Sequence, residues 1–314
     1  MRKRSITVGA LLAVLVIPLL LAGCAARPSG SLLQSKSSTQ VVRQIADAAD
    51  SKQVLSAKLS SFEASVQVIR DNQAETWTLR EGATDPVRSA IAPLDPAARP
   101  MRVKDVDLSG PANALAASDI STGCSERGVR LEVDLQLGRP LTHLICLDNS
   151  RHIWLGADLR PISDVDLRSA DGITTALGEL KAITGGGPIG NLALIYDENT
   201  RLELEQPGPC GNLVDCPATV VSRAALFGAQ PPFAARVGPA RLNYAVPIDP
   251  ATLDPAQLHG SIKQVMNDRK YNWWRQFTVT VYQVRENSPM MEFKVGDEVF
   301  YTDLAGRPLP NARS

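Results

Sequence analysis

Two segments near opposite ends of the chain alternate apolar and polar residues and then finish in turn residues. Residues 62–72 read Phe-Glu-Ala-Ser-Val-Gln-Val-Ile-Arg-Asp-Asn, and residues 277–287 read Phe-Thr-Val-Thr-Val-Tyr-Gln-Val-Arg-Glu-Asn. Such alternation places every second side chain on one face of a strand, and the closing residues are typical of a hairpin turn. We predict that each segment is the first strand of a hairpin, and that both occupy equivalent places in a repeated unit.

A helical pattern precedes both predicted hairpins. Asp254, Pro255 and Gln257 supply an N-cap, a proline at the first helical position and a capping-box glutamine. The apolar stripe that follows consists of Leu258, Ile262, Val265 and Met266. The corresponding stripe near the start of the chain consists of Val41, Val42, Ile45, Ala48 and Ala49. A helix followed by a hairpin is therefore expected at both ends.

Two weaker copies lie between these ends. In one, Asp171 is expected to cap a helix that carries Ile173, Leu177 and Leu180 on one face. A glycine-rich turn over 185–188 then leads into paired strands over 192–196 and 201–205. The other copy has a short helix over 111–118 and a hairpin that joins 129–137 to 141–147.

Two phrases also recur along the chain. Asp-Val-Asp-Leu occurs at 105–108 and at 164–167, each time at the predicted end of a strand before a helix. The segment 153–161 resembles 299–308. The proline-rich stretches 86–100 and 228–239 are interpreted as loops.

These patterns predict an α+β fold in which helices cover antiparallel sheets, built from up to four degenerate units of helix, hairpin and third strand. A unit of this kind cannot bury its apolar face alone, so two units per domain is the simplest arrangement. We assign 1–23 to a signal peptide, 24–38 to a flexible tether, 39–168 to a first domain and 169–314 to a second.

The first residues indicate export. Three positive charges at residues 2–4 precede an apolar run over 6–21, which is too short for a spanning helix and is broken by Pro18. The run ends in Leu21-Ala22-Gly23-Cys24, which resembles the lipobox of bacterial lipoproteins. That resemblance covers residues 1–24 and implies a diacylglyceryl thioether on Cys24, cleavage before it, and anchorage to a membrane outside the cytoplasm. It implies nothing about the activity of the mature chain.

The balance of charge gives no hint of a nucleic-acid partner. The chain has 33 basic and 33 acidic residues, so its formal net charge is zero. Hydrophobic residues make up 44% of the chain and aromatic residues 5%, which describes a globular protein with a mainly aliphatic core.

Four cysteines remain after Cys24. They are Cys124, Cys146, Cys210 and Cys216, and an even number in an oxidising compartment favours disulfides. Three pairings are possible. We favour Cys210–Cys216, which would close a turn-rich loop, and Cys124–Cys146, which would be neighbours if 129–137 and 141–147 form a hairpin. The CxxC spacing of metal sites is absent and the three histidines are scattered, so no metal or cofactor is expected.

The sequence contains few motifs that carry chemistry. Residues 185–190 satisfy G-x-G-x-x-G, but they follow a predicted helix and enter a strand, so we interpret them as a helix stop. Asp105 begins a run like a calcium loop, yet position twelve is Ala116 instead of glutamate. The common nucleophile, zinc-protease and phosphate-loop motifs are missing. His152, beside Trp154, is interpreted as structural.

One surface candidate remains, at the predicted junction of the last helix and its strand. Aromatic and basic residues alternate there, and Tyr271, Trp273, Trp274 and Arg275 could form a contact with a partner or a membrane. The alternative is that the tryptophans pack beneath the helix while the cations stay solvated.

The resulting functional hypothesis is a non-enzymatic, membrane-anchored extracytoplasmic lipoprotein that binds a protein or a cell-envelope component. Two alternatives stay open: a carrier of an apolar or lipid ligand, and an envelope hydrolase without a recognisable motif. The partner, the oligomeric state and the choice of membrane are not specified by the sequence.

Overall fold

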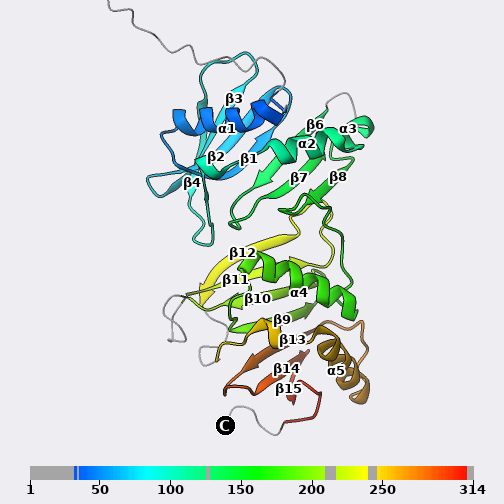
Figure 1. The fold of residues 1–314 in the computed structure, drawn as a ribbon. Coiled ribbons are helices and arrows are strands. Elements are labelled where there is room, and N and C mark those ends of the chain that lie inside the picture. Colours follow the sequence, from blue (N-terminus) through cyan, green and yellow to red (C-terminus); the bar gives the residue numbers. More distant parts are fainter. Residues whose placement is uncertain (1–31, 34, 125–127, 209–216, 240–245, 310–314) are drawn as a thin grey trace, which may run out of the picture.

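The computed structural model describes residues 32–309, apart from 34, 125–127, 209–216 and 240–245 (Figure 1). The α-helices are α1 (Ser35–Ala48), α2 (Ser109–Ala117), α3 (Ile120–Gly123), α4 (Ala170–Thr184) and α5 (Pro255–Asp268). The first sheet contains β1 (Gln53–Leu59), β2 (Glu63–Arg70), β3 (Gln73–Arg80), β4 (Val87–Pro93), β5 (Met101–Arg102), β6 (Val129–Asp134), β7 (Leu141–Cys146) and β8 (His152–Leu155). The second contains β9 (Asn191–Tyr196), β10 (Arg201–Gln206), β11 (Pro217–Ala224), β12 (Phe233–Pro239), β13 (Phe277–Gln283), β14 (Pro289–Val295) and β15 (Glu298–Asp303).

Each sheet is assembled from two units that meet at its centre. The order of the first sheet is β4-β3-β2-β1-β6-β7-β8, with β5 paired to β1, and that of the second is β12-β11-β10-β9-β13-β14-β15. A helix precedes each meander of three or four strands, and the first strands of two units pair antiparallel, as β1 with β6 and β9 with β13. The predicted α+β fold of helix-and-hairpin units is confirmed, and two units share each sheet.

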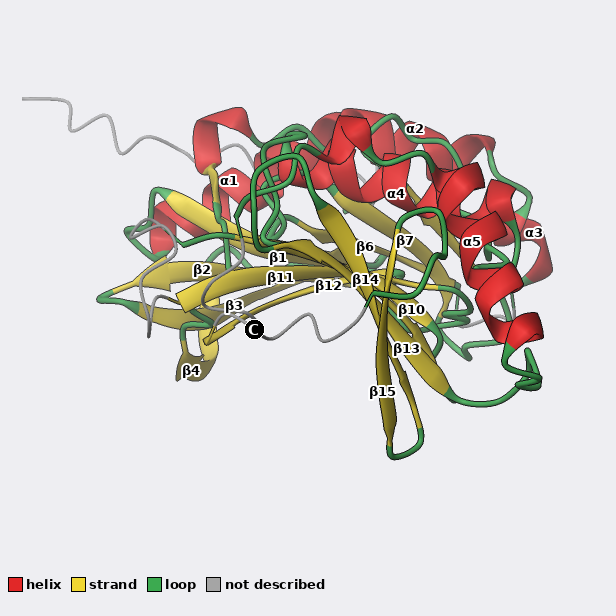
Figure 2. Ribbon diagram, turned by 90° about the horizontal axis from the view of Figure 1, so that it is seen from below, coloured by secondary structure: helices red, strands yellow, loops and turns green. Residues whose placement is uncertain are grey.

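All the helices lie on one side of the sheets, as Figure 2 shows. The reason is the alternation within the strands: Ala57, Leu131 and Leu144 point towards α1, α2 and α3 and belong to one buried cluster. In the second half, Leu194 and Val279 pack in the same way beneath α4 and α5. The opposite face of each sheet therefore has no helix over it. Among the described residues, no helix has both the length and the apolar character needed to cross a bilayer.

The resemblance between 153–161 and 299–308 corresponds to one repeated turn. The Gly156 amide donates to the Arg160 carbonyl at 2.9 Å, and the Asp303 amide donates to the Arg307 carbonyl at 3.0 Å. In both places the chain then folds back. Pro161 forms an isolated antiparallel β-bridge with Leu155, and Pro308 forms one with Thr302. The same turn thus closes the last strand of each sheet.

The recurring Asp-Val-Asp-Leu phrase also has a common structure. Asp107 Oδ1 accepts from the Ser109 amide and Asp166 Oδ1 accepts from the Arg168 amide, each just ahead of a helix. The phrases lie in loops and not at strand ends, contrary to our prediction, because their Val and Leu side chains are buried as anchors for the incoming helix.

Asp254 caps α5 as predicted, since its Oδ1 accepts from the amides of Ala256 and Gln257. We expect Asp254→Ala to lower the free energy of unfolding by about 1 kcal/mol, because two amides of the first helical turn lose their acceptor. Urea titration measures the change. Asp268→Ala, at the exposed last residue of α5, is the matched control and should be neutral or slightly stabilising; equal losses in both variants would contradict the capping role.

Two of the sequence predictions for the units are wrong in detail. Ser169, not Asp171, caps α4, since its hydroxyl accepts from the Gly172 amide and Asp171 lies inside the first turn. Segment 62–72 contains β2, the second strand of its unit, whereas 277–287 begins with β13, the first strand of its own. The two hairpins exist, but they are not equivalent.

Both proline-rich stretches contain an edge strand that our interpretation as loops missed. Every residue of β4 is exposed, and β12 buries only Phe233 fully, so neither strand shows the alternation of a covered surface. At the other end, α1 begins at Ser35 and Leu32 is buried, so ordered structure starts within the segment assigned to the tether. Ala48 is exposed, while Ala46 takes its place in the α1 stripe.

Candidate functional site

The helix-free face of the first sheet carries two neighbouring rows of polar residues. Strand pairing places one row across five strands: Ser65, Lys58, Glu132, His143 and Trp154. The next row, about 7 Å along each strand, is Thr76, Gln67, Ser56, Asp134 and Leu141. Each row thus gathers residues that are far apart in the sequence, and we call the surface that they form the polar cleft.

The polar cleft is a concave site between the two halves of the chain. It has a volume of about 490 Å³, and Pro231, from the loop before β12, borders it from the second half. Gln136, which follows β6, adds a further amide to its wall. A volume of this size is within the range of small-molecule sites.

Glu132, His143 and Trp154 are consecutive members of the first row, and the His143 and Trp154 side chains are buried. The His143 and Trp154 rings are stacked, with centroids 3.9 Å apart and planes 2° from parallel. His143 Nδ1 lies 3.5 Å from Glu132 Oε2, and the whole His143 residue is only 3% exposed to solvent. The carboxylate therefore orients the imidazole against the indole.

Two carboxyl groups of the cleft respond to this environment in opposite ways. Burial alone would raise the pKa of Glu132, but the hydrogen bond from His143 and the charges of Lys58 and Arg130 lower that pKa to about 2. Burial raises the pKa of Asp134, against the lowering effect of the Gln136 amide. Glu132 is thus firmly ionised, whereas Asp134 takes up a proton more readily than an exposed carboxylate does.

Two ring nitrogens in the cleft have no hydrogen-bond partner among the residues that the structure describes. They are His143 Nε2 and Trp154 Nε1, both closed off from bulk water. A buried polar atom left unpaired costs about 1–3 kcal/mol. The two unpaired nitrogens therefore make the folded state less stable than an apolar surface at this place would. Unpaired buried polar atoms of this kind are common at functional sites.

The matching row of the second sheet differs. Trp154 and Tyr301 occupy the same position relative to the closing turn, and the pairing from Tyr301 leads through Glu292 and Thr280 to Ala193. No histidine and no tryptophan stand in this row. The repeated unit therefore does not require a histidine or a tryptophan at these two positions, and in the first sheet Trp154 also packs against the core of the second half.

The Glu132–His143 pair has the form of an oriented base but is not an assembled acyl-transfer centre. Catalysis of that kind needs a hydroxyl or thiol within hydrogen-bond distance of the other ring nitrogen. In the described part of the chain His143 Nε2 has no such partner. The described residues also hold no group of three side chains placed to bind a metal ion.

Replacing Glu132 by Gln is expected to remove an acid-sensitive part of the stability. A carboxylate with a lowered folded-state pKa stabilises the protein above its unfolded value of 4.5, and this contribution is lost as the pH falls towards about 2. We expect Glu132→Gln to cost about 1–2 kcal/mol at pH 7, allowing for partial exposure, and nothing near pH 2. Urea titrations across this range measure the difference, and a cost independent of pH would contradict the assignment.

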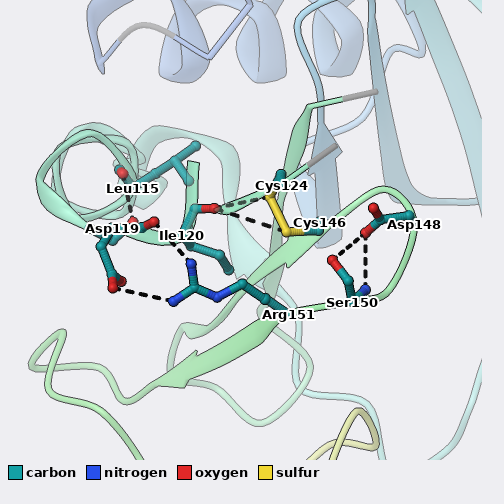
Figure 3. The surroundings of a disulfide bond; sticks show 9 residues. Leu115, Asp119, Ile120, Cys124, Cys146, Asp148, Ser150 and Arg151 are labelled. Atoms are coloured by element: carbon teal, nitrogen blue, oxygen red, sulfur yellow. Dashed lines mark hydrogen bonds and ion pairs between the residues drawn. A yellow bond between two sulfur atoms is a disulfide. The ribbon is translucent and has the colours of Figure 1, made fainter. Parts of the chain in front are cut away.

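Cys124 and Cys146 form the predicted disulfide (Figure 3). Their Cα atoms are 5.3 Å apart, and the bond ties the end of α3 to the end of β7. Beside it, Arg151 Nη2 pairs with Asp119 Oδ2 at 3.2 Å across the same junction. Cys24, Cys210 and Cys216 lie outside the described residues, and so do the lipobox and the second favoured pairing.

The aromatic and basic residues after α5 have divided roles. Trp273 packs against the core, with its ring 5.7 Å from that of Phe277, and Tyr271 donates to Glu298. Trp274 is 75% exposed and lies over the Arg168 guanidinium. Arg275 is exposed. Trp273 is thus partly buried against the core, whereas Trp274 and Arg275 are exposed.

The sequence analysis missed the main residue of the cleft. His152 was singled out from the sequence, and its ring lies 6.0 Å from that of His143, which was not singled out. The signal was present in the predicted hairpin, because pairing 129–137 with 141–147 in register places His143 opposite Glu132. Lys58 could not be found in this way, since β1 was not predicted.

No known family model matches the sequence, and no curated protein matches it. Solved structures with some likeness include a beta clamp of Helicobacter pylori in complex with diflunisal, with 7% identity, 89% of this chain and 65% of that chain covered, and a TM-score of 0.15. Proliferating Cellular Nuclear Antigen from Entamoeba histolytica has 12% identity over 83% of this chain and 91% of that chain, with the same TM-score. This chain spans less than two thirds of the length of the first. At that TM-score the likeness carries no inference about function.

Proposed function

We propose that this chain is a lipid-anchored extracytoplasmic protein that binds a polyhydroxylated cell-envelope component in the polar cleft, without turning it over. The observation that supports the binding role is the pair of cross-strand rows, which place Glu132, His143 and Trp154 together on the helix-free face of the first sheet.

The extracytoplasmic location is supported by two independent features. The Leu21–Cys24 segment has the residues of a lipobox. The Cys124–Cys146 disulfide is typical of proteins that fold in an oxidising compartment. A lipid on Cys24 would hold the cleft near the membrane through the short segment that precedes α1.

The chemistry of the cleft favours a neutral ligand rich in hydroxyl groups. Its charges balance, because Lys58 and Arg130 lie beside Glu132 and Asp134. An anion would meet the carboxylates and a cation would meet Lys58. The hydroxyl and amide side chains that line the cleft are those of Ser56, Ser65, Gln67, Thr76 and Gln136. Sugar hydroxyls both donate and accept, which matches such a mixed set of carboxylates, amides and hydroxyls.

The test is isothermal titration of the mature chain, secreted with Cys24→Ser so that it carries no lipid, against a panel of soluble envelope sugars. We expect at least one sugar to bind, and Glu132→Gln to weaken it about tenfold or more, because a charged hydrogen bond contributes about 1.5–3 kcal/mol. Glu292→Gln removes a carboxylate from the corresponding row of the second sheet, at the position that His143 occupies in the first, and this matched control should leave binding unchanged. Binding of no sugar, or equal losses in both variants, would contradict the proposal.

A further inference from the structure

A second cavity, of about 450 Å³, lies at the junction of the two halves and is mostly apolar. Its walls come from the β6–β7 turn, the turn after β8, the end of α4 and the start of β12. The apolar residues that line it are Leu137, Pro140, Leu141, Ala157, Pro161, Ile162, Ala182, Ile183 and Phe233. We call it the apolar cavity.

The charged residues around the apolar cavity do not turn it into a polar site. Asp158 pairs with Arg160, whose side chain is 86% exposed, and Glu179 pairs with the buried Arg223. Arg139 is exposed at the rim. The interior therefore offers apolar contact, and its charges are paired or directed towards water.

The apolar cavity and the polar cleft meet at one residue. Leu141 ends the second polar row and lines both sites. One short segment of the second half reaches both sites, since Pro231 borders the cleft and Phe233 the cavity. A molecule that extends past Leu141 would contact the polar cleft at one end and the walls of the apolar cavity at the other.

We propose that the two sites together bind one amphiphile, with a sugar-like head group in the polar cleft and an acyl chain in the apolar cavity. The placement of the head rests on the proposed function, whereas the chain rests on the apolar cavity alone. Each methylene that leaves water contributes about 0.8 kcal/mol. An acyl chain would therefore supply most of the affinity and the head group most of the specificity. The ligand class is a glycolipid.

The test is the extraction of the full-length protein, purified from native membranes in a detergent that contains no sugar. Chloroform–methanol extraction followed by mass spectrometry reports what is bound without a covalent link, so the lipid on Cys24 does not interfere. We expect one molecule per chain that contains both a hexose and an acyl chain. Ala182→Trp, at an exposed position on the cavity wall, should reduce its recovery at least tenfold, and Ala48→Trp, at an exposed position on α1, should not.

The outcomes separate this inference from the proposed function. Recovery of a free sugar, of an acyl chain without a sugar, of a lipid that is unaffected by Ala182→Trp, or of nothing would overturn the amphiphile. In each of these cases the calorimetric titration with soluble sugars still decides the binding role of the cleft. If the recovery of the lipid falls in Ala182→Trp but is unchanged in Glu132→Gln, the acyl chain binds in the apolar cavity. The placement of the head group in the polar cleft is then overturned.

Discussion

Replacing Arg223 by Met is expected to lower the free energy of unfolding by about 3–5 kcal/mol, the largest effect of any single substitution considered for this protein. The Arg223 side chain is fully buried between the sheet and α4. Its Nε lies 2.6 Å from Glu179 Oε2, and its Nη2 donates to the Ser163 carbonyl at 2.6 Å. Removal of the guanidinium leaves a partly buried carboxylate and a carbonyl without their donors.

Two comparisons make this prediction specific. Arg236→Met removes an arginine that is 58% exposed in its pair with Glu203, and it should cost less than about 1 kcal/mol. In Arg223→Met/Glu179→Leu the unpaired carboxylate is gone, and much of the stability should return. Urea titration measures all three variants. A loss in Arg223→Met no greater than in Arg236→Met would contradict the stabilising role of the buried pair.

The second large effect is expected from the Cys124–Cys146 disulfide. The two cysteines are 22 positions apart, and closing a loop of that length restricts the unfolded chain enough to stabilise the folded state by about 3 kcal/mol. Cys124→Ser/Cys146→Ser should lose that amount under oxidising conditions. The loss should appear in the first half, because the bond joins α3 to β7.

Hydrogen exchange locates the loss. Amides of β6 and β7 should exchange faster in the double variant, while those of β13 and β14, in the equivalent positions of the second sheet, keep their rates. Unchanged stability, or faster exchange spread evenly over both sheets, would contradict this account of the disulfide.

The sequence was sufficient to predict elements whose burial is one-sided. The stripe of Leu258, Ile262, Val265 and Met266 is buried as expected, and β6, whose buried residues alternate, lies within a few residues of its predicted bounds. The reason is that a helix or strand with one covered face repeats its apolar residues with a fixed period. Duplication of the unit made the pattern visible more than once.

Two strands, β1 and β4, were not predicted, because neither shows the regular alternation of a strand with one covered face. In β1 both Val54 and Leu55 are buried, since a bulge between Val54 and Ser56 breaks the alternation. In β4 no residue is buried, so the strand carries no periodic signal. Missing β1 also led to the false equivalence of β2 with β13.

The polar cleft could be predicted only in part, because its rows run across strands that are distant in the chain. Glu132 and His143 face each other within one predicted hairpin, but Lys58 joins them only through the pairing of β1 with β6, the contact between two units. Trp154 was noted for its neighbour His152, whereas its stacking partner is His143 on the next strand. Cross-strand register, which local patterns do not specify, therefore defines the site.

The measurement that tests the central claim most directly is the mass of the N-terminal peptide of the protein isolated from native membranes. The account predicts that the chain begins at Cys24 and that this peptide carries a thioether-linked diacylglyceryl group. A peptide that begins elsewhere, or an unmodified Cys24, would contradict the membrane anchorage on which the proposed role depends.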